Sequence, residues 1–337
     1  MIRRVYRAGL AACLLGGCMV AAHPDDDPVR LTETRRLMGV QWSITLYAPD
    51  EKTGRAAVGA GFAEVARLER ILSDYDPASE LSRLSAAAPT AAPVPVGGDL
   101  WDLLVRATAL REATDGAFDI TVGPLTSLWR QARRSGRLPR PDKLAAALAA
   151  VGPETMSLHV ASRTVGLRRA GMRLDPGGIG MGYAADRVLA LLTARGVRSA
   201  LVDASGDVAV SGPPPGSAGW RVAVDPLGDG FEPLPSLTLE HAAVTTSGDA
   251  YQAVEIEGVR YSHVVDPRTG LGVTGAVAAT VIAADCTTAD ALATAASVLG
   301  PTRGMAAVAR FPGAAVHFTW RQGDAVRTAS SPGWPEP

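Results

Sequence analysis

A carboxylate and a hydroxyl lie four residues apart in an alanine-rich segment whose pattern predicts a helix. Asp290 and Thr294 would face the same side of that helix, because side chains four residues apart are neighbours on a helical surface. Two oxygen donors of this kind suit a hard cation such as Mg²⁺. Thr287 and Asp290 also have the spacing of an N-terminal capping box, although Asp replaces the usual Glu or Gln. The residues alone leave a metal site and a helix cap as alternatives.

The most glycine-dense segment of the chain runs from Asp175 to Asp186. Glycines between a strand and a helix allow backbone N–H groups to approach a phosphate at the helix N-terminus. A dinucleotide-binding fingerprint requires G-x-G-x-x-G within a βαβ unit, whereas Gly180 and Gly182 are followed by Ala185. The segment therefore argues against a Rossmann fold. A tight strand-to-helix corner is the structural alternative to a phosphate-binding loop.

His263 ends a predicted strand and precedes a turn that contains Pro267 and Gly270. An imidazole can accept a proton near neutral pH, although a single histidine in a strand is also a common structural feature. The sequence contains no G-x-S-x-G, H-E-x-x-H or C-x-x-C, which argues against a serine hydrolase and a zinc site. The segments Tyr75–Pro77 and Gly116–Asp119 each place a carboxylate beside an aromatic residue at a loop, and a plain turn or a helix cap would explain either of them.

The elements that must position these residues are short strands and helices in mixed order, recognised by their periods of two and of 3.6 residues. Strand pairs joined by tight turns, such as Glu257-Gly258, favour an α+β fold over a doubly wound parallel sheet. We expect residues 31–337 to form a single compact unit of mixed sheets and helices, in one lobe or two. The expected strands are 40–46, 172–174, 220–224, 252–257, 260–265, 276–283 and 314–320; the expected helices are 58–72, 100–113, 182–195, 288–299 and 301–310, with a loop over 86–98.

The N-terminus predicts an export signal. Three arginines precede the short apolar run 8–15, which is too short to span a bilayer as a helix. Leu15-Gly16-Gly17-Cys18 resembles the lipobox of bacterial lipoproteins, in which the cysteine carries the lipid. We expect a signal peptide over 1–17, a lipidated tether over 18–30, and a mature protein anchored to a membrane and facing the periplasm. An ordinary cleaved secretory signal is the alternative.

The composition is that of a globular protein. The chain has 337 residues, of which 47% are hydrophobic and 20% are charged. Its net charge of −1, with no long basic run, argues against binding to nucleic acid. Its three cysteines are too few for a disulfide framework in a chain of this size.

Taken in order, these segments resemble the ApbE-type FAD:protein FMN transferases. The resemblance covers residues 38 to about 300, which is almost the whole chain after the predicted tether. The segments that carry it are Met38-Gly39, 72–82, 116–125, 175–186, 203–207, 246–249, 261–270 and 290–295.

The resemblance implies Mg²⁺-dependent transfer of the FMN half of FAD to a threonine of a target flavoprotein, with release of AMP. It implies a metal site formed by the side chains of Asp290 and Thr294 and the main-chain carbonyls of Gly178 and Ala293. It also places His263 at the position of a proton-transferring histidine. The residues implied to hold FAD are Met38, Tyr75, Ala117, Phe118, Asp119, Asp175, Met181 and Val264.

One position departs from the family. Many members carry a lysine or an acid where this chain has Met181, so any charged contact from that position is lost. The expected acceptor is a flavoprotein subunit of a membrane redox complex. Two alternatives remain open, namely an FAD pyrophosphatase that yields FMN and AMP, and a flavin-binding lipoprotein without enzymatic activity.

Overall fold

The fold is built on one large antiparallel sheet. A computed structural model describes residues 27–225, 234–248, 253–275, 277–323 and 325–335. Its eight-stranded sheet has the order β1-β2-β6-β7-β10-β14-β15-β16, and every neighbouring pair is antiparallel. These strands are β1 (Val29–Leu37), β2 (Val40–Ala48), β6 (Ala200–Ala204), β7 (Asp207–Val210), β10 (Ala242–Gly248), β14 (Val277–Ala283), β15 (Ala315–Gln322) and β16 (Ala325–Ser330).

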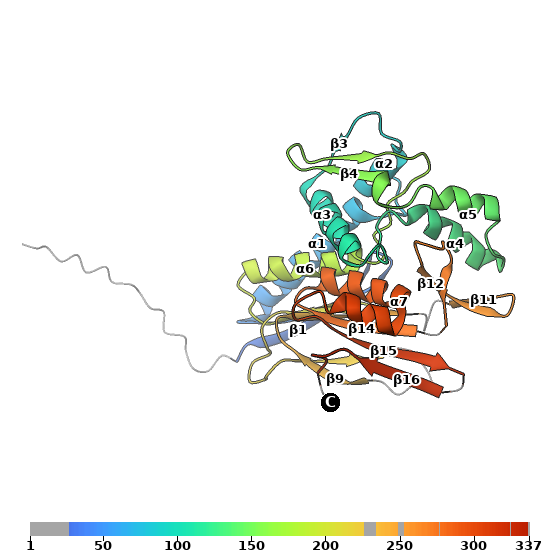
Figure 1. The fold of residues 1–337 in the computed structure, drawn as a ribbon. Helices are drawn as coiled ribbons and strands as arrows, with labels where there is room; N and C mark the ends of the chain where they lie inside the picture. The colour runs from blue at the N-terminus through green and yellow to red at the C-terminus, as the bar shows by residue number, and fades with distance from the viewer. Residues whose placement is uncertain (1–26, 226–233, 249–252, 276, 324, 336–337) are drawn as a thin grey trace, which may run out of the picture.

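Three long helices cover one face of this sheet (Figure 1). They are α1 (Glu51–Leu72), α6 (Gly180–Ala194) and α7 (Cys286–Val308). The main hydrophobic core lies between them and the sheet, where Trp42 and Ile44 of β2 are fully buried. The buried side chains of α1 follow the predicted 3.6-residue period from Val58 to Leu72, which confirms that helix and extends its start to Glu51.

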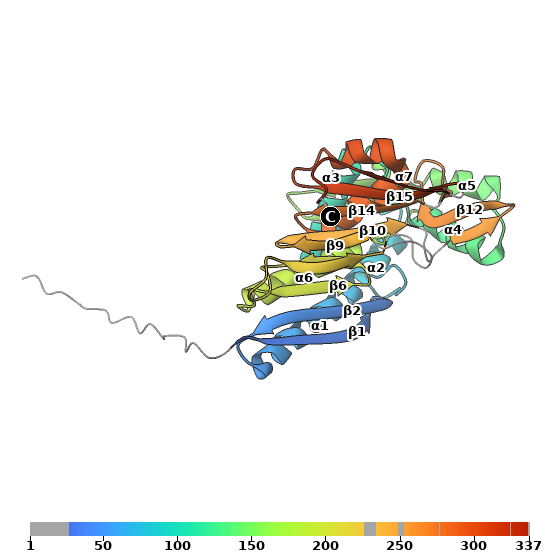
Figure 2. The ribbon, with the colours of Figure 1, turned by 90° about the horizontal axis from the view of Figure 1, so that it is seen from below.

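The opposite face of the sheet is partly covered by a two-stranded sheet of β8 (Trp220–Val224) and β9 (Leu234–Leu239). Figure 2 shows this side of the molecule, with the strands in front of the helices. Alternate residues of β7 divide between the two sides, since Val208 and Val210 pack with β8 and β9 while Ala209 joins the main core.

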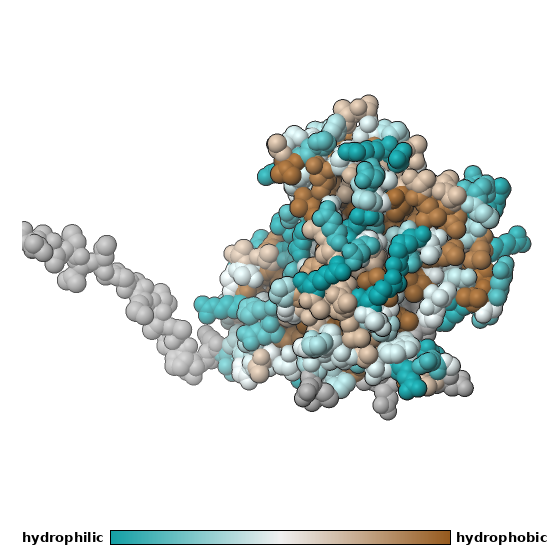
Figure 3. Space-filling view, in the orientation of Figure 1, coloured by the Kyte–Doolittle hydropathy of each residue, from teal (hydrophilic) through white to brown (hydrophobic). Residues whose placement is uncertain are grey.

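The remaining elements lie above the layered body and to its right in Figure 1. A small sheet of β11, β12 and β13 packs against α4 through a separate apolar cluster, and apolar side chains reach the surface over this part of the molecule (Figure 3). Trp129 of α4 donates a hydrogen bond from Nε1 to the carbonyl of Ser262, at 2.9 Å, and thereby fixes β12. The elements are α2 (Glu80–Ala86), α3 (Gly98–Ala113), α4 (Gly123–Ser135), α5 (Pro141–Leu148), a 3₁₀ turn (Pro153–Thr155), β3 (Val94–Pro95), β4 (Met156–His159), β5 (Thr164–Leu167), β11 (Ala253–Ile256), β12 (Val259–Val265) and β13 (Gly272–Thr274).

The antiparallel pairing confirms the predicted α+β fold, and a few expected elements differ. The expected strand 172–174 is wrong, because its one ladder contact is an isolated bridge between Val122 and Arg173. The two helices expected over 288–299 and 301–310 form the two parts of α7, and the predicted break between them is confirmed at Gly300, whose φ of 71° and ψ of 176° are not helical. The expected loop over 86–98 contains the short strand β3.

Several expectations lie at the edge of the described part of the chain. The predicted signal 1–17 and most of the tether lie outside the described residues, as do residues 252 and 276, with which two predicted strands begin. Strand β1 begins at Val29, within the last two residues of the predicted tether.

Candidate active site

One pocket gathers most of the residues singled out in the sequence. It has a volume of about 720 Å³, which is in the range of small-molecule sites, and it is formed by the β1–β2 turn, α4, the start of α6, and β12. Of the thirteen predicted site residues, Asp290 and Ala293 lie outside the lining, buried in α7. The other eleven line the pocket: Met38, Tyr75, Ala117, Phe118, Asp119, Asp175, Gly178, Met181, His263, Val264 and Thr294.

Met38 and Gly39 form the turn that joins β1 to β2. Both have positive φ, 50° and 79°, so the turn has the twist that suits a two-residue hairpin. The N–H of Met38 donates a hydrogen bond to Glu69 Oε1 of α1, at 2.9 Å. This contact fixes a non-glycine residue in the left-handed region at the rim of the pocket.

The predicted FAD residue Asp119 has its carboxylate fully occupied within the protein. Arg111 donates to Oδ2 at 2.6 Å, while the N–H and hydroxyl of Thr121 donate to Oδ1 at 2.9 and 2.6 Å. The side chain of Asp119 is 1% exposed. Its carboxylate therefore shapes the turn that presents Ala117 and Phe118 to the pocket.

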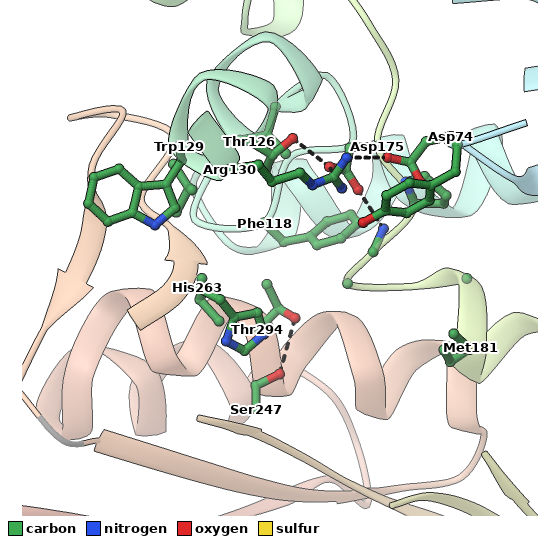
Figure 4. Close-up of a pocket in the computed structure, with 18 of the residues that line it drawn as sticks. Asp74, Phe118, Thr126, Trp129, Arg130, Asp175, Met181, Ser247, His263 and Thr294 are labelled. Carbon is green, nitrogen blue, oxygen red and sulfur yellow. Dashed lines mark hydrogen bonds and ion pairs between the residues drawn. The ribbon is translucent and has the colours of Figure 1, made fainter. Parts of the chain in front are cut away.

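An arginine that the sequence analysis missed contacts two of the predicted site residues, Tyr75 and Asp175. Arg130 of α4 donates to Asp74 Oδ2 at 2.8 Å and to Asp175 Oδ2 at 3.1 Å, as Figure 4 shows. Its guanidinium carbon lies 4.6 Å from the ring centroid of Tyr75. Asp175 Oδ2 also accepts a hydrogen bond from Thr126 at 2.5 Å. The signal that could have found Arg130 is helix α4, whose buried residues Leu125, Trp129 and Ala132 recur at helical spacing, but the sequence analysis did not predict this helix.

The glycine-rich segment allows α6 to approach α7 closely. A Cβ atom on Gly182 would lie 2.3 Å from the carbonyl oxygen of Cys286, and one on Gly178 would lie 2.7 Å from Thr294 Oγ1. The N–H of Gly182 donates to Asp290 Oδ2 at 3.1 Å. These contacts bring the start of α6 against the predicted metal ligands of α7.

Gly182→Ala is expected to lower the free energy of unfolding by about 1–3 kcal/mol, because its methyl group meets the backbone of α7. The matched control is Gly59→Ala in α1, where a Cβ meets nothing within 4 Å and where we expect stabilisation by up to about 1 kcal/mol. Urea unfolding of both variants measures the difference. An unchanged midpoint for Gly182→Ala would show that the two helices do not depend on this close approach.

The capping-box interpretation of Asp290 is wrong. The N-cap of α7 is Asp285, whose side chain accepts the N–H of Thr288 at 2.9 Å. The hydroxyl of Thr287 instead donates to Asp186 of α6. Asp290 therefore does not cap α7; its carboxylate instead accepts the N–H of Gly182 in the first turn of α6.

The surroundings of Asp290 fit a cation. The residue is 5% exposed, and burial raises its pKa to about 7, with a further contribution from the charge of Asp186. Burial also raises the pKa of Asp207, as does the charge of Asp290 nearby. A buried carboxylate beside other acids is costly unless a positive charge compensates it. Asp290 and Thr294 lie one turn apart on α7, and Gly178 packs against Thr294. The Asp290 carboxylate, the Thr294 hydroxyl and the main-chain carbonyls of Gly178 and Ala293 are hard oxygen donors of the kind that Mg²⁺ prefers.

Thr294 and His263 complete the lower side of the pocket in Figure 4. The hydroxyl of Thr294 lies 3.2 Å from that of Ser247, and Ser297 donates to the Ser247 carbonyl at 2.8 Å. His263 lies on β12, next to Ser262. Among the described residues, no group of three His, Cys, Asp or Glu side chains could hold a metal ion, and the predicted ligand set contains only one such side chain.

The site thus combines groups suited to attack on a pyrophosphate: a cation-compatible oxygen set, a histidine, and a glycine-rich helix start. The chain belongs to the ApbE family, whose model matches residues 38–318.

Known proteins resemble the chain over most of its length. A protein named FAD:protein FMN transferase from Treponema pallidum (strain Nichols) is 34% identical, over 91% of this chain and 89% of its own length. One of the same name from Klebsiella pneumoniae (strain 342) is 31% identical, over 97% and 95%. The apo structure of the flavinyl transferase ApbE from Pseudomonas stutzeri superposes with a TM-score of 0.80 at 30% identity, covering 91% of this chain and 96% of that one.

Proposed function

We infer that this protein is an FAD:protein FMN transferase. The family membership and the names of relatives that align over nearly the whole chain support this function. The observation that carries it for this chain is the pocket, because segments from residue 38 to residue 294 converge there with the residues expected to hold FAD.

We propose that the acceptor is a threonine hydroxyl of a target flavoprotein and that Mg²⁺ assists the reaction. The threonine oxygen forms a bond to the phosphorus of the FMN half, and the bond from that phosphorus to the bridging oxygen breaks. AMP leaves with the bridging oxygen. His263, at the pocket wall, takes the proton of the hydroxyl.

Asp290 and Thr294, with the carbonyls of Gly178 and Ala293, would hold the cation, which supplies neutralisation of the pyrophosphate charge. The raised pKa of Asp290 and the oxygen-rich surroundings of Thr294 support this assignment. Phe118, Val264 and Met181 give the pocket apolar walls against which the flat rings of FAD can pack.

The test is incubation with FAD, Mg²⁺ and a candidate acceptor subunit of a membrane redox complex, followed by mass spectrometry of the acceptor. We expect a mass increase of one FMN unit on a threonine, and release of AMP. Formation of free FMN and AMP at the same rate without acceptor would instead identify an FAD pyrophosphatase. Bound FAD that is never cleaved would identify a flavin-binding protein.

We propose further that the protein is exported and anchored by lipid at Cys18, facing the periplasm. The arginine-rich start, the short apolar run and the Leu15–Cys18 segment support the proposal. Within the described residues, none of the helices combines the length and the apolar character needed to cross a membrane.

Cys18→Ala is expected to abolish lipid attachment and to leave either unprocessed precursor or protein released from the membrane. Labelling of growing cells with a radioactive fatty acid, followed by membrane fractionation, measures both. The matched control is Cys13→Ala within the predicted signal, which we expect to be labelled like the wild type. Equal labelling of the Cys18→Ala variant would disprove the anchor.

A further inference from the structure

We propose that Arg130 is a positioning residue for FAD, which holds the Tyr75 ring as a stacking surface and neutralises the pair of carboxylates beside it. The proposal deepens the function above and rests on the binding of FAD in this pocket.

Tyr75 is an exposed aromatic residue held from one side. The residue is 75% exposed although it lines the pocket, and the guanidinium of Arg130 lies over its ring at 4.6 Å from the centroid. A guanidinium over the face of an aromatic ring is attracted by the ring quadrupole and fixes the orientation of the ring. The other face of Tyr75 remains available for a flat ring of the ligand. FAD carries two such rings, the adenine and the isoalloxazine.

The second contact of Arg130 is electrostatic. Asp74 and Asp175 come from different segments, and their side chains are 12% and 6% exposed. Arg130 donates a hydrogen bond from a separate nitrogen to each of them, so that a single cation bridges the half-buried Asp74 and the buried Asp175. Burial raises the pKa of Asp74, and the charge of Asp175 raises it further, whereas Arg130 lowers it. Without the arginine, two carboxylates would repel each other and the pyrophosphate of FAD.

The ion pair with Arg130 also holds Asp175 in contact with the glycine-rich segment. The second oxygen of Asp175, Oδ1, accepts the N–H of Gly177 at 2.8 Å, immediately before the start of α6. Arg130 therefore connects the Tyr75 loop, helix α4 and the start of α6 through one side chain. A planar guanidinium can make two hydrogen bonds and stack at the same time, whereas a lysine ammonium cannot.

The test compares Arg130→Met with Arg130→Lys by fluorescence titration of FAD without acceptor, and by kcat and KM for the transfer. We expect Arg130→Met to raise Kd and KM for FAD by about 10–100-fold and to change kcat at saturating FAD by less than about threefold. Arg130→Lys keeps the charge but loses the paired hydrogen bonds to the two carboxylates and the stacking on Tyr75. We therefore expect an intermediate increase in the Kd for FAD of roughly five- to tenfold. Asp74→Asn combined with Arg130→Met should recover part of the affinity, because it removes the unpaired charge.

The matched control is Arg134→Met, which removes the same charge from an exposed position on the same helix outside the pocket. We expect its Kd to equal that of the wild type. Tyr75→Ala distinguishes a failure of the proposed role of Arg130 from a failure of the proposal that FAD binds in this pocket. If Tyr75→Ala weakens FAD binding and both Arg130 variants bind FAD like the wild type, Arg130 has no positioning role. If neither Tyr75→Ala nor Arg130→Met changes Kd, FAD does not bind in this pocket. Should Arg130→Met fail to fold, the Kd of Arg130→Lys decides, and wild-type affinity there overturns the proposal.

Discussion

Asp290→Asn is expected to melt close to the wild type and to lose FMN transfer by about 10²-fold or more at Mg²⁺ concentrations that saturate the wild type. The asparagine keeps an oxygen that can accept the N–H of Gly182, so the contact between α6 and α7 survives. It lacks the charge that a hard cation requires. Because Asp285 caps α7, the substitution leaves the helix start intact. Activity as a function of Mg²⁺ concentration, together with thermal melting, measures the two effects separately.

The pKa of Asp290 adds a pH signature to this prediction. Its value of about 7 lies above the ordinary value of 3.8, so the folded state binds a proton that the unfolded state has lost between pH 4 and 7. The contribution of Asp290 to the stability of the metal-free protein therefore falls as the pH rises through this window and is lowest above pH 7. Asp290→Asn should flatten this slope, although Asp207, whose pKa is raised in the same direction, keeps part of it. Wild-type activity at unchanged Mg²⁺, with an unchanged slope, would place the metal elsewhere.

The matched control is Asp285→Asn, which alters a carboxylate at the start of the same helix without touching the predicted ligands. Asn is as good a helix cap as Asp, so we expect little loss from the cap itself. The lost ion pair with Arg106 is a partly exposed one and is worth about 1 kcal/mol or less. Its Mg²⁺ dependence should equal that of the wild type. A shift in Mg²⁺ dependence for both variants would indicate a general electrostatic effect of the acids on α7.

The local sequence pattern was sufficient to predict a helix or strand where that element buries one face against the main core. Helix α1 and strand β2 were predicted because their apolar residues recur at the period of their own geometry. Strands β1 and β16 were missed for the opposite reason. Both lie at the edges of the large sheet, and only Leu31 of β1 is buried, so neither carries a clear alternation. Their pairing partners, and not their own sequences, make them strands.

The candidate site likewise has features that the sequence predicts and contacts that only the tertiary fold determines. The order of motifs located the residues of one pocket, but it did not show which contacts hold them there. Thr287 and Asp290 have the spacing of a cap, yet Asp285 and Thr288 have it too, and the choice is made by Asp186 from α6. Arg130 lies on a helix that is stabilised by packing against β12, far along the chain. Contacts of this kind depend on the tertiary fold and leave no local signal.

His263→Ala is expected to bind FAD like the wild type and to lose FMN transfer by roughly 10²–10⁴-fold, the usual contribution of a general base. A threonine hydroxyl is a weak nucleophile, so removal of the base should slow the bond-forming step and leave the affinity for FAD unchanged. The side chain is positioned by β12, which Trp129 fixes from α4 through the carbonyl of Ser262. Single-turnover mass spectrometry of the acceptor measures the rate, and fluorescence titration measures FAD binding.

The matched control is His159→Ala, which removes an exposed histidine of β4 outside the pocket and should transfer FMN at the wild-type rate. Added imidazole is expected to restore part of the rate of His263→Ala, because a small base can enter the space that the side chain leaves. A structural role for His263 predicts a different pattern: a lowered melting temperature, weaker FAD binding and no response to imidazole. The response to imidazole decides between the two, since a packing defect cannot be repaired by a base in solution.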